Sequence, residues 1–438
     1  MSKNGLEMGV VGFISDLVSV REDGLRLLIS ILAGYPLAAI YRSFIYNKRP
    51  AIQHYFFIAV GVLLYIFNCG VAIYHSLFNL SVVLAHVGFM GHLLMGYWFA
   101  ESARYDITWT TPFCIMTLRY IGLVMDVYDG KQNEKNLKSD QLKTAIKDPP
   151  SLVETAAFGL FFSGTLVGPQ FTLSRFRSFV NGEFLDEKRE VRSSSIMASI
   201  QRFVAGVSLL GLYGFLTHSL HRLSSITCPF LENYLEYLMV PSNYVSILHG
   251  FSSNGGICYS HRWDGTRDLN IIKWELGSDF QSVVESFNCG TNTFAKNHIF
   301  RRLKWLGNKY YSQAITLSYL AIWHGFHLGY FMLFFYEFTC MWAQGQLFAL
   351  IKRTEGAEEF FKQSWTRPFT WLFGRITINI SMAFGFLTFG LIKKEIWIVA
   401  LKAMYFYGYI IYFVVLPASF ALLWNVLPRK KSLKPKAT

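Results

Sequence analysis

Long apolar runs separated by short polar loops are the feature that most constrains the fold of this chain. A helix needs about 20 mostly apolar residues to cross the hydrocarbon core of a bilayer. Runs near that length recur along the sequence, and 16% of its residues are charged, against about 25% in ordinary soluble domains. We therefore predict an all-α, polytopic membrane protein rather than a set of soluble domains.

The apolar runs predict about eleven transmembrane or re-entrant helices. Pro36, Pro169, Pro241 and Pro417 each interrupt a run, and the last run is long enough to split or tilt. Non-helical backbone at membrane depth is tolerated only inside protein or beside a water-filled cavity. These interruptions therefore predict a solvated internal chamber. The candidate runs are residues 27–41, 54–75, 80–100, 109–127, 152–170, 202–220, 230–251, 311–335, 338–352, 369–392 and 396–427.

The net charge of +13 would suggest a nucleic-acid partner for a soluble protein. Here the lysines and arginines lie mostly between apolar runs and in the tail at 428–438. This distribution is typical of cytosolic loops that face anionic lipid head groups. We therefore expect membrane lipids, and no nucleic acid, as partners. The loop at 129–151, with five lysines, and the basic tail should both be cytosolic.

A second polar stretch, residues 253–310, contains a helical pattern near its end. Over residues 294–306, apolar side chains recur every three or four positions, with lysines and arginines mostly between them. The pattern predicts a basic amphipathic helix, lying either on the membrane surface or against the protein's own core. Asn292 precedes this helix and has the residue type expected of an N-cap.

Two histidines lie in the apolar segment SYLAIWHGFHLGYFMLFFYEF, residues 318–338. We expect His324 and His327 in the middle of one helix. Ionisable side chains at membrane depth are costly and are candidates for function, and histidine exchanges protons near neutral pH. His324 could be such a group, or a neutral histidine that bonds a neighbouring helix. Gly325 and Gly329 form a pair that favours close helix packing.

Several kinds of chemistry lack their sequence motifs. The histidines, cysteines and acidic residues show no metal-binding spacing, so we expect no metal. There is no phosphate-binding loop, no dinucleotide fingerprint and no nucleophile elbow of a serine hydrolase. A transporter with a histidine proton relay would explain intramembrane histidines, but transporters usually contain internal repeats, and the sequence shows none.

The motif WHGFHLGY, residues 323–330, closely resembles the histidine motif of the membrane-bound O-acyltransferase family. The upstream stretch FNCGTNTFAKNHIFRRLKWLGNK, residues 287–309, resembles the asparagine-bearing segment of its lysophospholipid acyltransferase branch. The chain looks most like the lysophosphatidylcholine acyltransferases of the animal endoplasmic reticulum. The resemblance covers roughly residues 25–425, and it extends to segments 116–130, 149–171 and 228–238. It implies a single acyltransferase domain over residues 1–438, including the basic tail at 428–438.

The resemblance also implies which residues form the site. The family's catalytic histidine precedes the first glycine of the motif, which makes it His324 here. The family's asparagine lies about three dozen residues upstream, as Asn288 does, and Asn292 is the competing candidate. Gly290 stands where the family pattern implies a larger residue. Substrate-binding candidates are Trp323, His327, Tyr330 and Asn292.

The mechanism that follows is direct acyl transfer in the internal catalytic chamber. His324 would remove the proton from the sn-2 hydroxyl of a lysophospholipid as it attacks the thioester carbonyl of acyl-CoA. Asn288 would orient the base or the substrate, or support the oxyanion. Lysophosphatidylcholine is the expected acceptor, with lysophosphatidylethanolamine and lysophosphatidylserine as further candidates. Acyl-CoA is a co-substrate, and we expect no other cofactor.

Three further expectations remain open in the sequence. The same fold could act on another acceptor, such as diacylglycerol, a sterol or a protein. A homodimer is a candidate assembly. The final residues, KPKAT, place lysines third and fifth from the end, as in the dilysine signal of endoplasmic reticulum membrane proteins. We therefore expect a multi-pass protein of that membrane.

Overall fold

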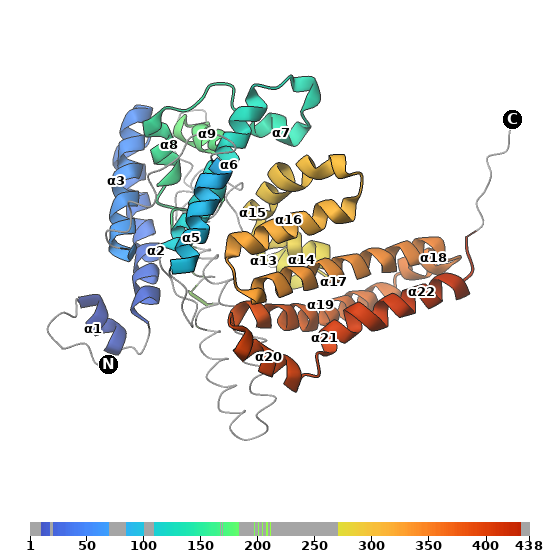
Figure 1. Cartoon of the computed structure of the whole chain (residues 1–438). Helices are drawn as coiled ribbons and strands as arrows, with labels where there is room; N and C mark the ends of the chain where they lie inside the picture. The colour runs from blue at the N-terminus through green and yellow to red at the C-terminus, as the bar shows by residue number, and fades with distance from the viewer. Residues whose placement is uncertain are drawn as a thin grey trace.

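The computed structural model describes residues 10–17, 21–69, 85–99, 109–166, 168, 170–183 and 270–430, together with a few single positions between 197 and 211. The elements within these residues are all helices, and none is a β-strand (Figure 1). The predicted all-α fold class is confirmed. The expected catalytic chamber and the count of about eleven membrane helices stay predictions.

The N-terminal part contains three long helices, α2, α3 and α6, with shorter helices before, between and after them. α2 continues into a π-helical turn at Tyr41–Ile45, and another π-helical turn, His86–Met90, leads into α5. The helices are α1 (Val10–Leu17), α2 (Glu22–Ile40), α3 (Pro50–Cys69), α5 (Gly91–Phe99), α6 (Thr110–Gly130), α7 (Ser139–Thr144), α8 (Leu152–Gly159) and α9 (Leu173–Val180), with a 3₁₀ turn at Glu134–Asn136.

The C-terminal part begins and ends with shorter helices, and its longest helices, α17 and α19, lie between them. In Figure 1, α17 and α19 run side by side, and α16 and α22 both pack against α17. The helices are α13 (Ile271–Leu276), α14 (Phe280–Ser286), α15 (Cys289–Phe294), α16 (Lys309–His324), α17 (Leu328–Arg353), α18 (Ala357–Lys362), α19 (Thr366–Gly390), α20 (Lys394–Ala403), α21 (Tyr407–Ile410) and α22 (Leu416–Val426).

Within the described residues, four helical segments are long and apolar enough to cross a membrane. They are Glu22–Ile45, Pro50–Cys69, Thr366–Gly390 and Tyr407–Val426. Each overlaps an apolar run of the sequence, and the last run splits between α20 and α21 as expected. The runs predicted at 202–220 and 230–251 lie almost entirely outside the described residues.

Three predictions about individual runs are wrong. The run at 152–170 is not one continuous helix, because α8 ends at Gly159 and turns follow. Pro36 does not break its run, since α2 continues through it to Ile40. Pro417 likewise stands in the first turn of α22, inside the candidate span Tyr407–Val426. The π-helical turn at Ile411–Val415, directly before Pro417, is the kind of local adjustment that accommodates a proline within a membrane helix.

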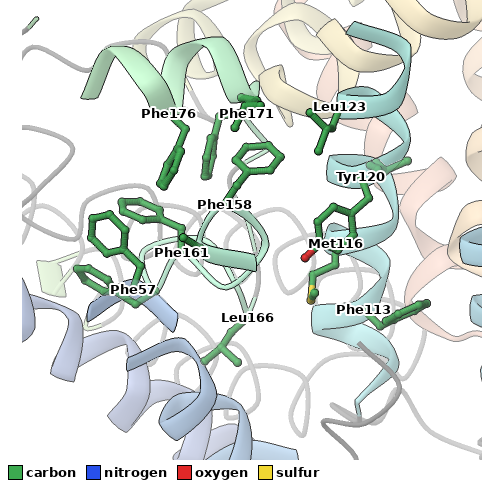
Figure 2. Packing of buried hydrophobic residues seen from close by; sticks show 14 of the residues in the cluster. Phe57, Phe113, Met116, Tyr120, Leu123, Phe158, Phe161, Leu166, Phe171 and Phe176 are labelled. Carbon is green, nitrogen blue, oxygen red and sulfur yellow. The ribbon is translucent and has the colours of Figure 1, made fainter. Parts of the chain in front are cut away.

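Buried side chains form two clusters, and the first is the N-terminal core. It contains buried residues from Leu27 to Val180 together with Phe294, Ala295, Leu320 and Trp323. Aromatic rings pack edge to face within it (Figure 2): the Phe57 and Phe161 ring centroids are 4.9 Å apart, and those of Phe161 and Phe176 are 5.7 Å apart. Such contacts stabilise beyond the burial of their area.

A fully buried arginine holds the short helix α8 in the N-terminal core. The Arg119 guanidinium donates hydrogen bonds to the carbonyl oxygens of Phe158, Gly159 and Gly164, at 3.3, 3.0 and 2.8 Å. It also lies 4.3 Å from the centroid of the Phe171 ring. Carbonyl groups at a helix C-terminus have no partner within the helix and favour a cation. Arg119 therefore has a structural role.

The second cluster is the C-terminal core, made by long helices. Its buried residues come from α13, α14, α17, α19, α20 and the segment of Tyr412. Thr388 of α19 donates a hydrogen bond to the carbonyl oxygen of Gly329 at 3.1 Å, and Ser381 bonds Tyr412 at 2.8 Å. A side chain at Gly329 would collide with the Thr388 carbonyl. Gly329 thus permits the close packing of α17 on α19 that the sequence predicts.

The basic segment at 294–306 is not one regular helix. It is a π-helical turn at Ala295–Ile299 followed by a 3₁₀ helix at Phe300–Leu306. Arg301 pairs with Asp140 and Arg302 with Asp129, each at 2.7 Å, and Asn297 is buried. These contacts with α6 and α7 favour packing against the protein over the membrane surface, the two alternatives that the sequence leaves open.

Candidate active site

His324 is the last residue of α16, and the chain breaks directly after it. Gly325 has φ 125° and ψ −172°, a backbone conformation that side chains disfavour. α17 starts at Leu328, with His327 as its N-cap residue. The prediction of one helix through both histidines is therefore wrong, as is the predicted division between the runs 311–335 and 338–352. The break places His324 at a helix end instead of on a helix face.

Aromatic rings from α17 and α19 surround the half-buried His324. Its ring centroid lies 5.6 Å from those of Tyr330 and Phe334, and 5.2 Å from that of Phe389. Tyr330 is buried and also contacts Phe389 and His327, at 5.0 and 5.8 Å. The candidates His324, His327 and Tyr330 are thus brought together around the helix break.

Trp323 ties the end of α16 to the N-terminal core. Its indole Nε1 donates a hydrogen bond to the Cys114 carbonyl oxygen of α6 at 2.9 Å, and Tyr97 of α5 donates to the Trp323 carbonyl oxygen at 3.1 Å. The Trp323 and His324 ring centroids are 4.5 Å apart. The side chain is 3% exposed. Its contacts position His324 and leave little surface for a substrate.

Asn288 stands between α14 and α15 with a left-handed backbone, at φ 48° and ψ 45°. Asparagine is one of the few residues that adopt this conformation at modest cost. Its half-buried side chain forms no capping bond to α15. Two residues later, a side chain at Gly290 would collide with the Gln170 carbonyl oxygen. Glycine at this position therefore lets α15 contact the loop before α9.

Asn292 has a different and clearly structural environment. Its Nδ2 donates hydrogen bonds to the carbonyl oxygens of Val284 and Phe287, at 2.6 and 2.7 Å. It lies inside α15, so the prediction that it caps the following helix is wrong. The two bonds join the end of α14 to α15. Asn292 thereby fixes the turn on which Asn288 stands.

A carboxylate near Asn288 is not a competing base. Glu285 of α14 is exposed and pairs with Lys273 at 2.6 Å. Hydrogen bonds from Lys273 and Gln281 hold the pKa of Glu285 below its ordinary value. Glu285 is therefore a weaker base than an ordinary glutamate, and both of its carboxylate oxygens already accept hydrogen bonds.

A row of aromatic rings connects Asn288 to His324. Phe287 contacts Phe386 of α19 at 6.4 Å between ring centroids, Phe386 contacts Phe389 at 6.3 Å, and Phe389 contacts His324 at 5.2 Å. One helix, α19, therefore lies beside both candidate residues. Their separation of 36 positions in the sequence is bridged by a third segment, about 60 residues beyond His324.

Sequence reasoning missed one residue of this region, Glu337. It is half-buried on α17, an otherwise apolar helix whose other charged residues, Lys352 and Arg353, stand in its last turn. Its position in the apolar segment 318–338 is the signal that marks it, since acidic groups at membrane depth are functional candidates.

Comparison with known proteins identifies the kind of chain that carries these residues. The pattern of the membrane-bound O-acyltransferase family matches residues 94–386, a range that contains Asn288 and His324. The chain belongs to the membrane-bound O-acyltransferase family. It is an acyltransferase and a multi-pass membrane protein, as the sequence predicts. This excludes the transporter alternative.

Relatives match this acyltransferase over nearly its whole length. It is 53% identical to lysophospholipid acyltransferase 5 of Caenorhabditis elegans, over 96% of both chains. It is 33% identical to the protein of that name in Drosophila melanogaster, over 97% of this chain and 92% of the relative. For the Homo sapiens protein the identity is 31%, over 95% of this chain and 92% of the relative.

Proposed function

We propose that this acyltransferase moves a fatty acyl group from acyl-CoA to the sn-2 hydroxyl of a lysophospholipid. Lysophosphatidylcholine is the first candidate acceptor, and lysophosphatidylethanolamine and lysophosphatidylserine follow. The names of relatives with up to 53% identity over the full length support this acceptor class. We assign His324 as the base and Asn288 as its partner in the site.

The observation that carries the proposal is where the two residues stand. Asn288 follows Phe287, which packs on the C-terminal core, and precedes Phe294 of the N-terminal core. His324 follows Trp323 of the N-terminal core; beyond it, Phe334 still packs on that core and Tyr336 belongs to the C-terminal core. The chain thus passes between the two cores close to both residues. Asn288 itself has a positive φ, and Gly325, next to His324, has one too. Unusual backbone of this kind is often found at functional sites.

The proposed chemistry needs one base and one polar amide. Neutral His324 accepts the proton of the sn-2 hydroxyl while that oxygen attacks the thioester carbonyl. A new ester bond forms, the carbon–sulfur bond breaks, and the CoA thiolate leaves and takes up the proton. The Asn288 amide orients the base or the substrate, or donates to the oxygen that becomes negative. The scheme requires no metal and no cofactor besides the co-substrate acyl-CoA.

The setting of the reaction is also part of the proposal. We place the protein in the endoplasmic reticulum membrane with its basic tail in the cytosol, where acyl-CoA is soluble. Residues 431–438, which carry the dilysine pattern, lie outside the described residues. A homodimer remains the proposed assembly beyond the single chain.

The purified full-length protein tests the proposal through the release of CoA thiol. Wild type should release thiol with lysophospholipids and give little release with diacylglycerol, cholesterol or a peptide acceptor. Loss of a general base costs typically 10²–10⁴-fold in rate. His324→Ala should show a loss of this size at normal folding, and the neighbouring His327→Ala a smaller one. More than about a tenth of wild-type turnover in His324→Ala would remove the base assignment.

A further inference from the structure

Glu337 has a position that the proposed chemistry does not explain. It is the one acidic residue of α17, a helix that the apolar runs of the sequence place at membrane depth although it is not among the four segments apolar enough to cross a membrane. Among the described residues, the structure gives its carboxyl group no hydrogen bond and no ion pair. An acidic group in such a place is costly unless something pairs with it. A ligand cation would offset that cost.

The direction of Glu337 follows from its neighbours on α17. Tyr330 and Gln344 are each seven residues away, which is about two helical turns, so the three residues share a face. Tyr330 contacts the His324 ring. Gln344 accepts a hydrogen bond from the backbone N–H of Phe280, the first residue of α14, at 2.6 Å. The face that carries Glu337 thus starts beside His324 and continues to α14, the helix that leads to Asn288.

The spacing along this face matches an acceptor lipid. The His324 ring is level with Tyr330 and Phe334, so Glu337 lies three to seven residues farther along α17, roughly 5–10 Å at 1.5 Å per residue. In a lysophospholipid with an amine head group, two glycerol carbons, the phosphate and a two-carbon linker separate the sn-2 oxygen from the ammonium nitrogen. The distance between the sn-2 oxygen and the ammonium nitrogen is therefore of the same order as the distance between His324 and Glu337 along α17.

We propose that Glu337 binds the cationic head group of the acceptor lysophospholipid, which makes it a specificity-determining residue for choline, ethanolamine or serine head groups. The inference rests on the proposed function. Phe334, one turn before Glu337 and in contact with His324, can supply an aromatic face to a quaternary ammonium. With the sn-2 hydroxyl at His324 and the ammonium at Glu337, the acceptor is held at both ends.

The test compares two acceptors of the same shape. One is lysophosphatidylcholine, and the other is its 3,3-dimethylbutyl analogue, in which carbon replaces the charged nitrogen. Both are assayed with wild type, Glu337→Gln and Glu337→Asp under one acyl-CoA concentration. Glu355→Gln, an exposed carboxylate just beyond α17, is the matched control. Losing one partner of a buried charge pair weakens binding strongly.

Wild type should therefore have a KM roughly 10–100-fold lower for the choline lipid than for the analogue. Glu337→Gln should bring the two KM values together with little change in kcat, and Glu337→Asp should keep part of the difference. The control should behave as wild type.

The wild-type comparison holds even where Glu337→Gln fails to fold. Equal KM values for the two acceptors in wild type, or an unchanged KM ratio in Glu337→Gln, would overturn the head-group assignment and leave the proposed function intact. If wild type acylates neither lysolipid, the proposed function itself fails, and this inference fails with it.

Discussion

The two cores of this acyltransferase bury their apolar side chains in different ways. The N-terminal core combines the long helices α3 and α6 with short helices and turns, such as α8 and α9, which are held by ring-to-ring contacts and by the buried Arg119. The C-terminal core uses the long helices α17 and α19, brought close at Gly329. Regular packing of long helices leaves little freedom for irregular backbone. A core that contains turns leaves more freedom for irregular backbone.

The difference matters at the two points where the chain passes between the cores. At Asn288 the backbone is left-handed, and at Gly325 it has φ 125°. Neither conformation is set by a helix, so each must be held by packing on both sides. The backbone at Asn288 is held by the hydrogen bond from Asn292 to the Phe287 carbonyl oxygen at the end of α14. The backbone at Gly325 is held by the hydrogen bond from Trp323 to the Cys114 carbonyl oxygen of α6. The candidate site is therefore only as well ordered as the contact between the two cores.

Of the two points where the chain passes between the cores, the one at Asn288 should show the largest effect on turnover. Asn288→Ala should lose about 10²–10³ in turnover, the cost of an oxyanion donor. Because alanine also disfavours positive φ, Asn288→Gly is the matched variant that keeps the backbone and removes only the amide. Both should be inactive at near-normal folding. Turnover per folded molecule, from thiol release and size-exclusion yield, measures this.

Asn292→Ala changes the same turn, but we expect it to lower the stability of the protein more than its turnover. It removes the bonds to Val284 and Phe287, which should lower stability by about 1–3 kcal/mol because two carbonyl groups lose their partner. Turnover per folded molecule should fall far less than in Asn288→Ala, because the turn is loosened but the Asn288 amide is still present. An active Asn288→Gly beside an inactive Asn292→Ala would move the site by one helical turn.

The second passage is tested by Gly325→Ala. The φ of 125° is accessible to glycine at little cost, whereas alanine should pay about 1–3 kcal/mol. A penalty of that size lowers the population of the native passage by about 5–150-fold. The variant should therefore lose activity while both cores still melt cooperatively.

Gly345→Ala is the control, because Gly345 is helical and exposed on α17 with open space around it. That change should be neutral or slightly stabilising. Equal turnover in the two variants would show that the backbone at Gly325 is not strained by a side chain.

The sequence predicts the long helices well and the passages poorly. α3 and α19 follow from apolar runs, since length and composition are enough to define them. The break after His324 cannot be predicted from the apolar runs, because one run continues across Gly325 and this residue resembles an ordinary packing glycine. His324 and Asn288 were found through their motifs. The sequence does not predict that Phe386 and Phe389 connect the two residues, because α19 is brought to the site by tertiary packing alone. Glu337 stands in the sequence as a single acidic residue within an apolar run, and no motif marks it.

The smallest expected effect compares one tryptophan from each core. Trp323 and Trp397 are both 3% exposed. Trp323 donates its indole N–H to the Cys114 carbonyl, whereas the Nε1 of Trp397 has no hydrogen-bond partner among the described residues. Replacement by Phe removes a similar area from each core, but only at Trp323 does it also remove a hydrogen bond. Hydrogen bonds of this kind contribute about 0.5–1.5 kcal/mol.

Trp323→Phe should therefore lower the melting temperature by a few degrees more than Trp397→Phe does, as measured by thermal unfolding in detergent. It should also reduce turnover, because the ring of Trp323 packs against His324 at 4.5 Å and its N–H fixes the end of α16 on α6. Trp397→Phe should leave turnover near wild type. If both variants lose stability and activity equally, the order of the site does not depend on its attachment to the N-terminal core, and the comparison of the two passages loses its basis.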